Sequence, residues 1–139
     1  MQKKLTVFGI ILAIGFGGLF LFSPGAQSDG QFTAVSPKEA SALVEMQKGN
    51  SDFIILDIRT PGEYQSGHIK KAIMIDFYSK TYAQEVDRLD KTKTYLVHCR
   101  SGNRSTRSMA LFKKLQFQKI YHLSSGINGW KSEGLPLVK

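Results

Sequence analysis

The sequence predicts an α/β fold: a single open, five-stranded parallel sheet flanked by helices on both faces, preceded by an N-terminal hydrophobic signal or anchor helix. Short apolar runs alternate with helix-like patterns from residue 31 onward, which is typical of βαβ units. The chain has 139 residues, enough for one domain of ordinary size, and 42% of them are hydrophobic and 22% charged, as in globular proteins. We therefore expect one domain over residues 31–139.

Five short runs, dense in apolar and β-branched residues, supply the predicted strands. Helix-like patterns lie between them, so that consecutive strands can pair in parallel. Ligands bind beyond the carboxyl ends of the strands in sheets of this kind. The predicted strands are 32–35, 53–57, 72–75, 94–98 and 119–123.

The first two predicted helices begin with the same capping signal. Ser-Pro-Lys-Glu at 36–39 and Thr-Pro-Gly-Glu at 60–63 each supply a hydroxyl N-cap and a proline at the first helical position. The glutamate of each tetrapeptide completes a capping box. Helices are predicted over 37–47, from 60, and over 82–89, 105–115 and 127–133.

Residues 1–30 form a separate segment. Lys3 and Lys4 precede an uncharged, mostly apolar run over 5–22, and small polar residues follow it, as in a secretion signal. The run has about 18 residues, which is near the lower limit for a helix that spans a bilayer. We therefore expect a cleaved signal peptide or an uncleaved membrane anchor. Pro24, at a position where cleavage needs a small residue, favours the anchor.

This segment also predicts where the domain resides. Lys3 and Lys4 favour an amino end on the cytoplasmic side, so the domain is expected to be exported, to the periplasm or to the outer face of the cytoplasmic membrane. As an anchor, the segment would make the membrane a partner of the chain. Exported proteins commonly pair their cysteines, yet Cys99 is the only cysteine in this chain. An unpaired thiol in an exported protein is a candidate reactive group.

The charge of the chain points to small anionic partners. Its net charge is +8, from 19 Lys and Arg against 11 Asp and Glu. Without residues 1–30, which hold two lysines and one aspartate, 17 remain against 10, a charge of +7. The lysines are spread along the chain, with no zinc-ligand spacing and no RNA-binding signature, so nucleic acid is disfavoured. A basic domain of this kind can steer small anions.

Cys99 lies between a predicted strand and a predicted helix. It follows the apolar run 94–97 and opens a short loop that closes where the helix begins. Such a loop aims backbone N–H groups and the positive end of the helix dipole at one point, where the sulfur would lie. A thiol at that point ionises more readily than a free thiol, and the thiolate is the nucleophilic form. The pattern predicts a sulfur nucleophile that meets a small anion.

Three stretches, in the right order, resemble the rhodanese family of sulfurtransferases. Cys-Arg-Ser-Gly-Asn-Arg-Ser at 99–105 matches the active-site pattern Cys-Arg-x-Gly-x-Arg-Ser of that family. Leu-Asp-Ile-Arg-Thr-Pro-Gly-Glu-Tyr at 56–64 matches its upstream signature. Gly-Ile-Asn-Gly-Trp at 126–130, with Gly-Leu-Pro at 134–136, matches its carboxyl-terminal one. The resemblance covers nearly all of residues 32–138.

The resemblance implies both a fold and an activity. The fold is a parallel sheet of five strands with helices on both sides. In the activity, Cys99 takes the outer sulfur of thiosulfate or a similar donor, such as polysulfide, holds it as a persulfide, and passes it to a thiol or cyanide. No cofactor and no metal are implied. Relatives that process phosphate or arsenate have five residues between cysteine and arginine, whereas four separate Cys99 from Arg104, which favours sulfur transfer.

The substrate-binding groups are expected in the loop that follows Cys99. Its N–H groups would stabilise the thiolate and then the terminal sulfur of the persulfide. Arg100 is expected to hold the sulfonate of thiosulfate, and Arg104 either to do the same or to pair with a buried carboxylate. Gly102 would permit a left-handed turn, and Ser105 would cap the helix, with a contact to the sulfur as a further role. The assigned loop residues are Arg100, Ser101, Gly102, Asn103, Arg104 and Ser105.

Asp57 and Arg59 are assigned supporting roles. Asp57 ends a predicted strand and is expected to accept hydrogen bonds from a neighbouring loop or from Arg59, as a structural ion pair rather than as a general base. No separate base is needed by a thiol of low pKa. None of the histidines has the spacing of a metal ligand, and all three are interpreted as structural: His68, His98 and His122.

Two other functions are weighed against sulfur transfer. The chain would be a persulfide carrier or an interaction module if it docked on a membrane-bound partner without turnover of its own. It would be a phosphatase or an arsenate reductase if the loop held a tetrahedral oxyanion, which the four-residue spacing disfavours. The sequence carries no signal for the oligomeric state or for the physiological donor and acceptor.

Overall fold

The computed structural model describes residues 30–139, and these form one five-stranded parallel sheet in the order β1-β5-β4-β2-β3. The predicted sheet is thereby confirmed. The predicted N-terminal hydrophobic helix lies outside the described residues. The strands are β1 (Gln31–Val35), β2 (Phe53–Asp57), β3 (Ile73–Met74), β4 (Thr94–His98) and β5 (Lys119–Leu123).

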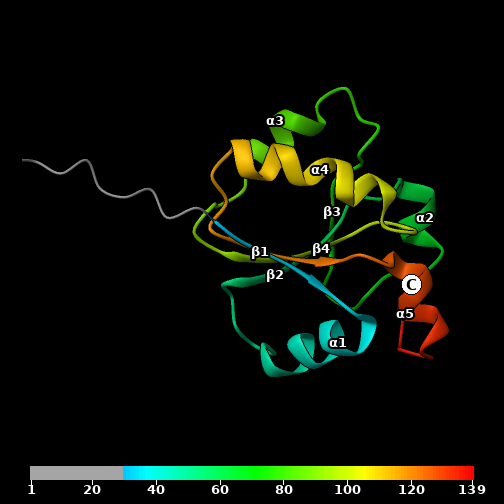
Figure 1. The fold of residues 1–139 in the computed structure, drawn as a ribbon. Coiled ribbons are helices and arrows are strands. Elements are labelled where there is room, and N and C mark those ends of the chain that lie inside the picture. The colour runs from blue at the N-terminus through cyan, green and yellow to red at the C-terminus, as the bar shows by residue number, and fades with distance from the viewer. Residues whose placement is uncertain (1–29) are drawn as a thin grey trace, which may run out of the picture.

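Helices cover both faces of the sheet, as predicted. Figure 1 shows α3 and α4 on one face and α1 on the other, with α2 and α5 near one end of the strands. Within residues 30–139, none of the helices is both long and apolar enough to cross a membrane. The helices are α1 (Pro37–Met46), α2 (Pro61–Gln65), α3 (Tyr82–Asp87), α4 (Asn103–Lys114) and α5 (Gly126–Ser132).

The two predicted capping boxes are both present. The Ser36 hydroxyl accepts from the Glu39 amide at 3.3 Å, and the Glu39 carboxylate accepts from the Ser36 amide at 2.7 Å. Thr60 and Glu63 repeat this arrangement at the start of α2, at 3.3 and 3.1 Å. These bonds satisfy N–H groups that a helix start leaves without partners, which is why both helices begin where the sequence predicts.

Several predicted element boundaries differ from the structure by one or two residues, and local contacts explain two of these differences. Strand β3 spans Ile73–Met74 instead of the predicted 72–75, and it starts late because the amide of Ala72 bonds to the carbonyl of Ile69 in a turn at 2.9 Å. Helix α4 begins at Asn103 and not at residue 105, because Gly102 adopts a left-handed conformation with φ +97° and serves as the N-cap. The loop after β4 is therefore shorter than the sequence predicts.

The core has two layers, one on each face of the sheet. Alternate residues of β4 divide between them: Tyr95 and Val97 face α3 and α4, whereas Leu96 faces α1 and α5. In the first layer Phe117 packs edge-on against Tyr95 and Phe112, with ring centroids 5.3 and 4.9 Å apart. This alternation directs successive side chains at the end of β4 to opposite faces of the sheet.

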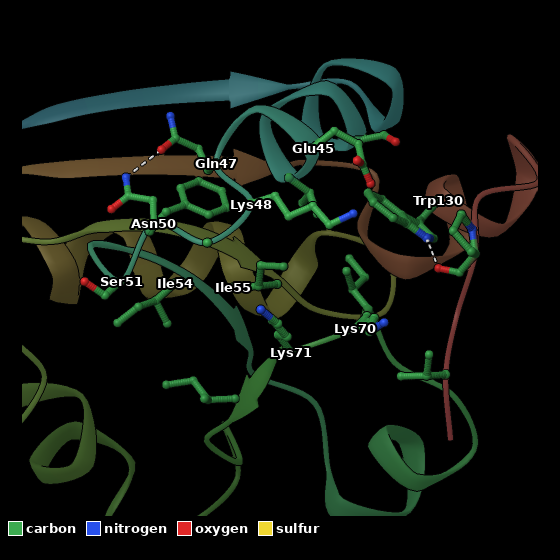
Figure 2. Close-up of a pocket in the computed structure, with 18 residues that line it drawn as sticks. Glu45, Gln47, Lys48, Asn50, Ser51, Ile54, Ile55, Lys70, Lys71 and Trp130 are labelled. Carbon is green, nitrogen blue, oxygen red and sulfur yellow. Dashed lines mark hydrogen bonds between the residues drawn. The ribbon is translucent and has the colours of Figure 1, made fainter.

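A cavity of about 680 Å³ lies on the α1 face, where β2 begins. Figure 2 shows Lys48, Lys70 and Lys71 around it, with Ile55 and Trp130 among its apolar walls. No residue of the Cys99 loop lines it.

Candidate active site at the carboxyl ends of the strands

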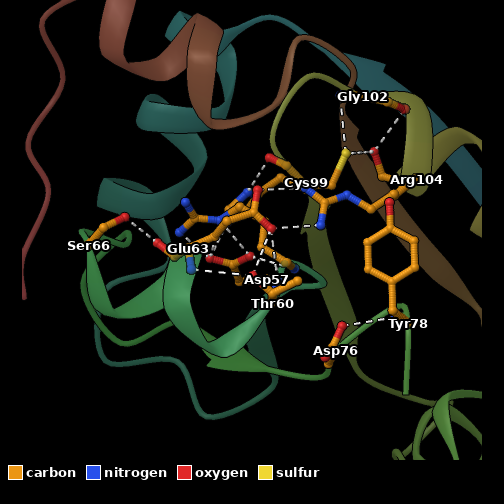
Figure 3. Close-up of polar contacts among 12 residues, drawn as sticks. Asp57, Thr60, Glu63, Ser66, Asp76, Tyr78, Cys99, Gly102 and Arg104 are labelled. Carbon is orange, nitrogen blue, oxygen red and sulfur yellow. Dashed lines mark hydrogen bonds and ion pairs between the residues drawn. The ribbon is translucent and has the colours of Figure 1, made fainter. Parts of the chain in front are cut away.

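Cys99 directly follows β4, and its sulfur is held by two hydrogen-bonding groups. The amide of Gly102 donates to Sγ at 3.1 Å, and the hydroxyl oxygen of Ser105 lies 3.4 Å from Sγ (Figure 3). The residue is only 1% exposed. The thiol therefore lies at the edge of the apolar core with its sulfur directed toward polar groups of the loop.

The loop is shaped by bonds from α5 to its carbonyl groups. The amide of Ile127 donates to the carbonyl of Cys99 at 2.9 Å, and that of Asn128 donates to the carbonyl of Arg100 at 3.0 Å. Since these carbonyls point toward α5, N–H groups of the same loop are left to face the sulfur. Gly126 makes this contact possible: it has φ +62°, and a Cβ there would overlap the carbonyl of Arg100.

Gly102 is the turning point of the loop. Its φ of +97° is the predicted left-handed conformation, which glycine adopts without strain. A Cβ at this position would overlap the carbonyl oxygen of Ser124 and lie 2.9 Å from its carbonyl carbon. The close approach of the segment before α5 therefore excludes any side chain at residue 102, independently of the φ angle.

The environment of Cys99 favours the thiolate. Burial raises the pKa of the Cys99 thiol, but hydrogen bonds from the Ser105 hydroxyl and from the amides of Ser105, Gly102 and Ser101 outweigh burial and bring the pKa below the ordinary value. The first turn of α4 adds its positive dipole end at the same place. A thiol with these neighbours is more nucleophilic at neutral pH than a free cysteine.

Ser105 has a different role from the predicted helix cap. Because α4 begins at Asn103, Ser105 lies inside its first turn, and Gly102 is the N-cap. The Ser105 hydroxyl donates to the carbonyl of Gly102 at 3.1 Å, contacts Cys99 Sγ, and lies 2.7 Å from Nε2 of His122. The capping prediction is wrong, whereas the contact to the sulfur is present.

Arg104 forms an ion pair and does not project freely into the mouth of the site. Its guanidinium donates to both carboxylate oxygens of Glu63, at 2.8 and 2.7 Å (Figure 3). This bond lowers the pKa of Glu63 to about 2 and raises the pKa of Arg104. The guanidinium also lies over the ring of Tyr78, 5.4 Å from its centroid. Of the two roles predicted for Arg104, the structure shows the pairing, although Glu63 is half-buried and not buried.

The remaining loop residues line a hollow of about 430 Å³ at the mouth of the site. Arg100, Ser101 and Asn103 are exposed there. The side chain of Arg100 makes no hydrogen bond or ion pair with another residue of the described range, so its charge is available to an anion. The hollow is lined by Glu63, Tyr78, Arg100, Ser101, Asn103 and Arg104.

Asp57 and Arg59 form the expected structural ion pair. The Arg59 guanidinium donates to Asp57 at 2.7–3.0 Å and to the carbonyl of Gly67 at 2.8 Å, and both charged groups are buried. Nε2 of His98 lies 3.7 Å from the same carboxylate, and burial lowers the pKa of His98. The pair ties the end of β2 to the segment after α2. Asp57 is therefore a structural group and does not contact the sulfur.

Three residues that lie in or beside this site were not assigned to it from the sequence: Glu63 was predicted only to cap a helix, Tyr78 was given no role, and His122 was interpreted as structural. The sequence around Glu63 predicts only a capping box, so it gives no indication that the same carboxylate also binds Arg104. Tyr78, 66% exposed, belongs to a connection with no motif. Ile120 and His122 alternate along β5, which places both side chains on the face covered by α4. A histidine at an inward-facing position of a predicted strand is the sequence signal that could have assigned His122 to the site. The residues that the structure describes contain no group of three His, Cys, Asp or Glu side chains that could hold a metal ion.

Comparisons with known proteins identify the family. Residues 36–133 match the model of the rhodanese-like domain. A sulfurtransferase of Allochromatium vinosum is 27% identical over 104 residues, which cover 75% of this chain and 95% of that protein. The thiosulfate sulfurtransferase GlpE of Actinobacillus pleuropneumoniae is also 27% identical, over 76% of this chain and 93% of its own.

Solved structures agree with this assignment. A rhodanese-related protein from Thermoplasma volcanium superposes with a TM-score of 0.64 at 24% identity, over 76% of this chain and 97% of that chain, which shows the shared fold. Because the family model matches most of the chain, the protein belongs to the rhodanese-like domain family. The resemblance inferred from the three motifs is thus confirmed. The curated relatives described above are sulfurtransferases by name.

Two glycines with similar backbone angles provide a test of the contact between α5 and the loop. Gly126→Ala and Gly134→Ala both place alanine at a left-handed φ, +62° and +68°, which costs about 1–2 kcal/mol. Only the first also forces a Cβ into the carbonyl of Arg100, since nothing lies within 4 Å of a Cβ at Gly134. Urea unfolding should show a loss of stability larger by about 1–3 kcal/mol for Gly126→Ala. Equal losses would contradict the proposed role of this contact.

The ion pair between Glu63 and Arg104 predicts a pH-dependent contribution to stability. The pKa of Glu63 falls from 4.5 to about 2 on folding, so the folded protein binds this proton less readily than the unfolded chain. Its stabilising effect is therefore complete above pH 4.5 and declines as the pH falls toward 2. The difference in unfolding free energy between wild type and Glu63→Gln should shrink between these values.

Glu39→Gln is the matched control, because Glu39 caps α1 in the same way and has no arginine partner. Urea unfolding at several pH values measures both differences. A difference for Glu63→Gln that stayed constant down to pH 2, or one no larger than that for Glu39→Gln, would show that the pair with Arg104 contributes nothing.

Proposed function

We propose that this protein is a sulfurtransferase that moves the sulfane sulfur of thiosulfate or polysulfide to a thiol or cyanide through a persulfide on Cys99. One observation carries the proposal. The sulfur of Cys99 accepts a hydrogen bond from the Gly102 amide at 3.1 Å and lies 3.4 Å from the Ser105 hydroxyl. The same groups that stabilise a thiolate suit the terminal sulfur of a persulfide, which also carries a negative charge.

In the first step, the Cys99 thiolate attacks the outer sulfur of thiosulfate. A bond forms between the two sulfurs, and the sulfur–sulfur bond of thiosulfate breaks, so that sulfite leaves with the electron pair. Cys99 is then a persulfide with one negative charge on the terminal sulfur. Arg100, exposed at the mouth of the site and without another partner among the described residues, suits the sulfonate group of the donor.

In the second step, a nucleophile attacks the terminal sulfur of the persulfide. Cyanide yields thiocyanate, and a thiolate yields a new persulfide, and in both cases the electron pair returns to Cys99 as thiolate. No side chain has to act as a base, because the thiol already has a lowered pKa. Arg104 contributes by position: its ion pair with Glu63 joins α2 to the start of α4 beside the loop.

The proposal is tested with the purified domain and Cys99→Ser. With thiosulfate and cyanide, the wild type should form thiocyanate and the variant none, because the nucleophile is absent. After exposure to the donor alone, intact mass should rise by about 32 Da, one sulfur atom, in the wild type only. Thiocyanate formation by Cys99→Ser, or none by a folded and reduced wild type with thiosulfate and with polysulfide, would contradict the proposal. Gain of mass without turnover would support the carrier function instead.

Export of the domain is a separate proposal, supported by the order of charges and apolar residues in segment 1–30. Fusion of alkaline phosphatase to the carboxyl end of the full chain should give an active reporter, since that enzyme is active only outside the cytoplasm. Fusion to residues 31–139 is the control and should be inactive. An inactive full-length fusion would contradict export. The mass of the exported chain separates an anchor that begins at Met1 from a cleaved product.

A further inference from the structure

His122 lies next to the sulfur site without touching the sulfur. It is the fourth residue of β5, paired with Val97 of β4 and Ala34 of β1, and its ring is on the face covered by α4. There, Nε2 lies 2.7 Å from the hydroxyl oxygen of Ser105, which in turn lies 3.4 Å from Cys99 Sγ. The three side chains form a continuous polar chain at the edge of an otherwise apolar layer.

The Ser105 hydroxyl has one proton and three possible acceptors. These are the carbonyl of Gly102 at 3.1 Å, the sulfur of Cys99 at 3.4 Å and Nε2 of His122 at 2.7 Å. When Nε2 carries no proton, it is the nearest acceptor, and the Ser105 hydroxyl donates its hydrogen bond to Nε2. The sulfur of Cys99 then faces the lone pairs of the hydroxyl oxygen. When Nε2 carries a proton, it donates to the hydroxyl oxygen, and the hydroxyl proton is free to point at the sulfur.

We infer that His122 is a positioning residue that orients the Ser105 hydroxyl toward the sulfur of Cys99 and relays the thiol proton to solvent. This inference deepens the proposed function, on which its relevance to sulfur transfer rests. Its subject, the ionisation of Cys99, can be measured without any sulfur donor.

The relay conserves protons at every step. In the thiol state, Sγ–H donates to the Ser105 oxygen, the Ser105 hydroxyl donates to Nε2, and Nδ1 of His122 carries the ring proton. On ionisation, the sulfur proton passes to the Ser105 oxygen, the hydroxyl proton passes to Nε2, and Nδ1 releases its proton to water. The net change is one proton lost to solvent, and the neutral imidazole has changed tautomer.

The surroundings of His122 suit this role. Burial alone lowers its pKa, so no charged group holds the ring in the imidazolium form and it stays neutral at pH 7. The residue is 8% exposed. Its Nδ1 has no hydrogen-bond partner within residues 30–139 and is not fully enclosed. Arg104 of α4 and Tyr82 of α3 also interact with the Cys99 charge, and no hydrogen bond joins either of them to His122.

The test measures the rate of alkylation of Cys99 by iodoacetamide against pH, since only the thiolate reacts and the chain has one cysteine. His122→Leu removes the donor to Ser105 and should raise the apparent pKa of Cys99 by about one unit, which is a tenfold loss of rate at pH values below the pKa of the wild-type thiol. His122→Gln places an amide N–H near the position of Nε2 and should stay within about twofold of wild type. Ser105→Ala should resemble His122→Leu.

The double variant Ser105→Ala with His122→Leu decides whether the two residues act together. It should lose no more rate than either single variant, because each variant interrupts the same chain of hydrogen bonds to the sulfur. Additive losses would overturn the inference, as would an unchanged pH profile in folded His122→Leu. If that variant fails to fold, His122→Asn replaces it, since the shorter amide does not reach Ser105. An unchanged profile in His122→Asn would also overturn the inference.

A control variant establishes that a shifted pKa comes from the chain of His122 and Ser105, and a parallel assay separates this inference from the proposed function. His68→Leu alters a histidine that bonds to the carbonyl of Tyr64 away from the loop, and it should leave the alkylation profile unchanged. Thiocyanate formation is measured in parallel. Normal sulfur transfer with an unshifted pKa in His122→Leu contradicts only the relay, whereas a shifted pKa in a protein without transferase activity contradicts only the proposed function.

Discussion

The site depends on two backbone hydrogen bonds from the first turn of α5 to the loop that follows β4. The carbonyls of Cys99 and Arg100 accept these two hydrogen bonds. The loop is thereby held in an orientation that leaves its amides free to donate to the sulfur. Glycine at residues 102 and 126 lets the two segments approach closely enough for this. A short loop thus acquires a defined shape from a helix that begins more than twenty residues further along the chain.

The chemistry of the site follows from a balance between burial and donated hydrogen bonds. Cys99 is almost enclosed, which alone would make its thiolate costly. The amides of the loop and the Ser105 hydroxyl reverse that cost, and the pKa falls below the ordinary value. Under the proposed function, the same low exposure would shield a persulfide on Cys99 from unwanted reactions with solvent species.

The charged side chains around the loop divide into structural and available groups. Arg59 is buried with Asp57, and Arg104 is joined to Glu63, so both guanidinium groups are committed to holding elements together. Arg100 alone among the three lacks such a carboxylate partner in the described range. Neighbouring arginines in one short motif therefore have different uses, which depend on whether a carboxylate lies within reach.

The sequence by itself determined the parallel sheet, the capped helix starts and the loop that carries Cys99, because apolar periodicity, capping boxes and the spacing of a motif are local properties. Only the tertiary structure decided which side chains of the site bind one another. Glu63 meets Arg104 across 41 residues, and His122 meets Ser105 across 17. Helix α4 begins early, and Ser105 is not its cap, because Gly102 turns the chain against Ser124. Contacts between residues distant in the chain depend on how strands and helices pack, and no local pattern encodes them.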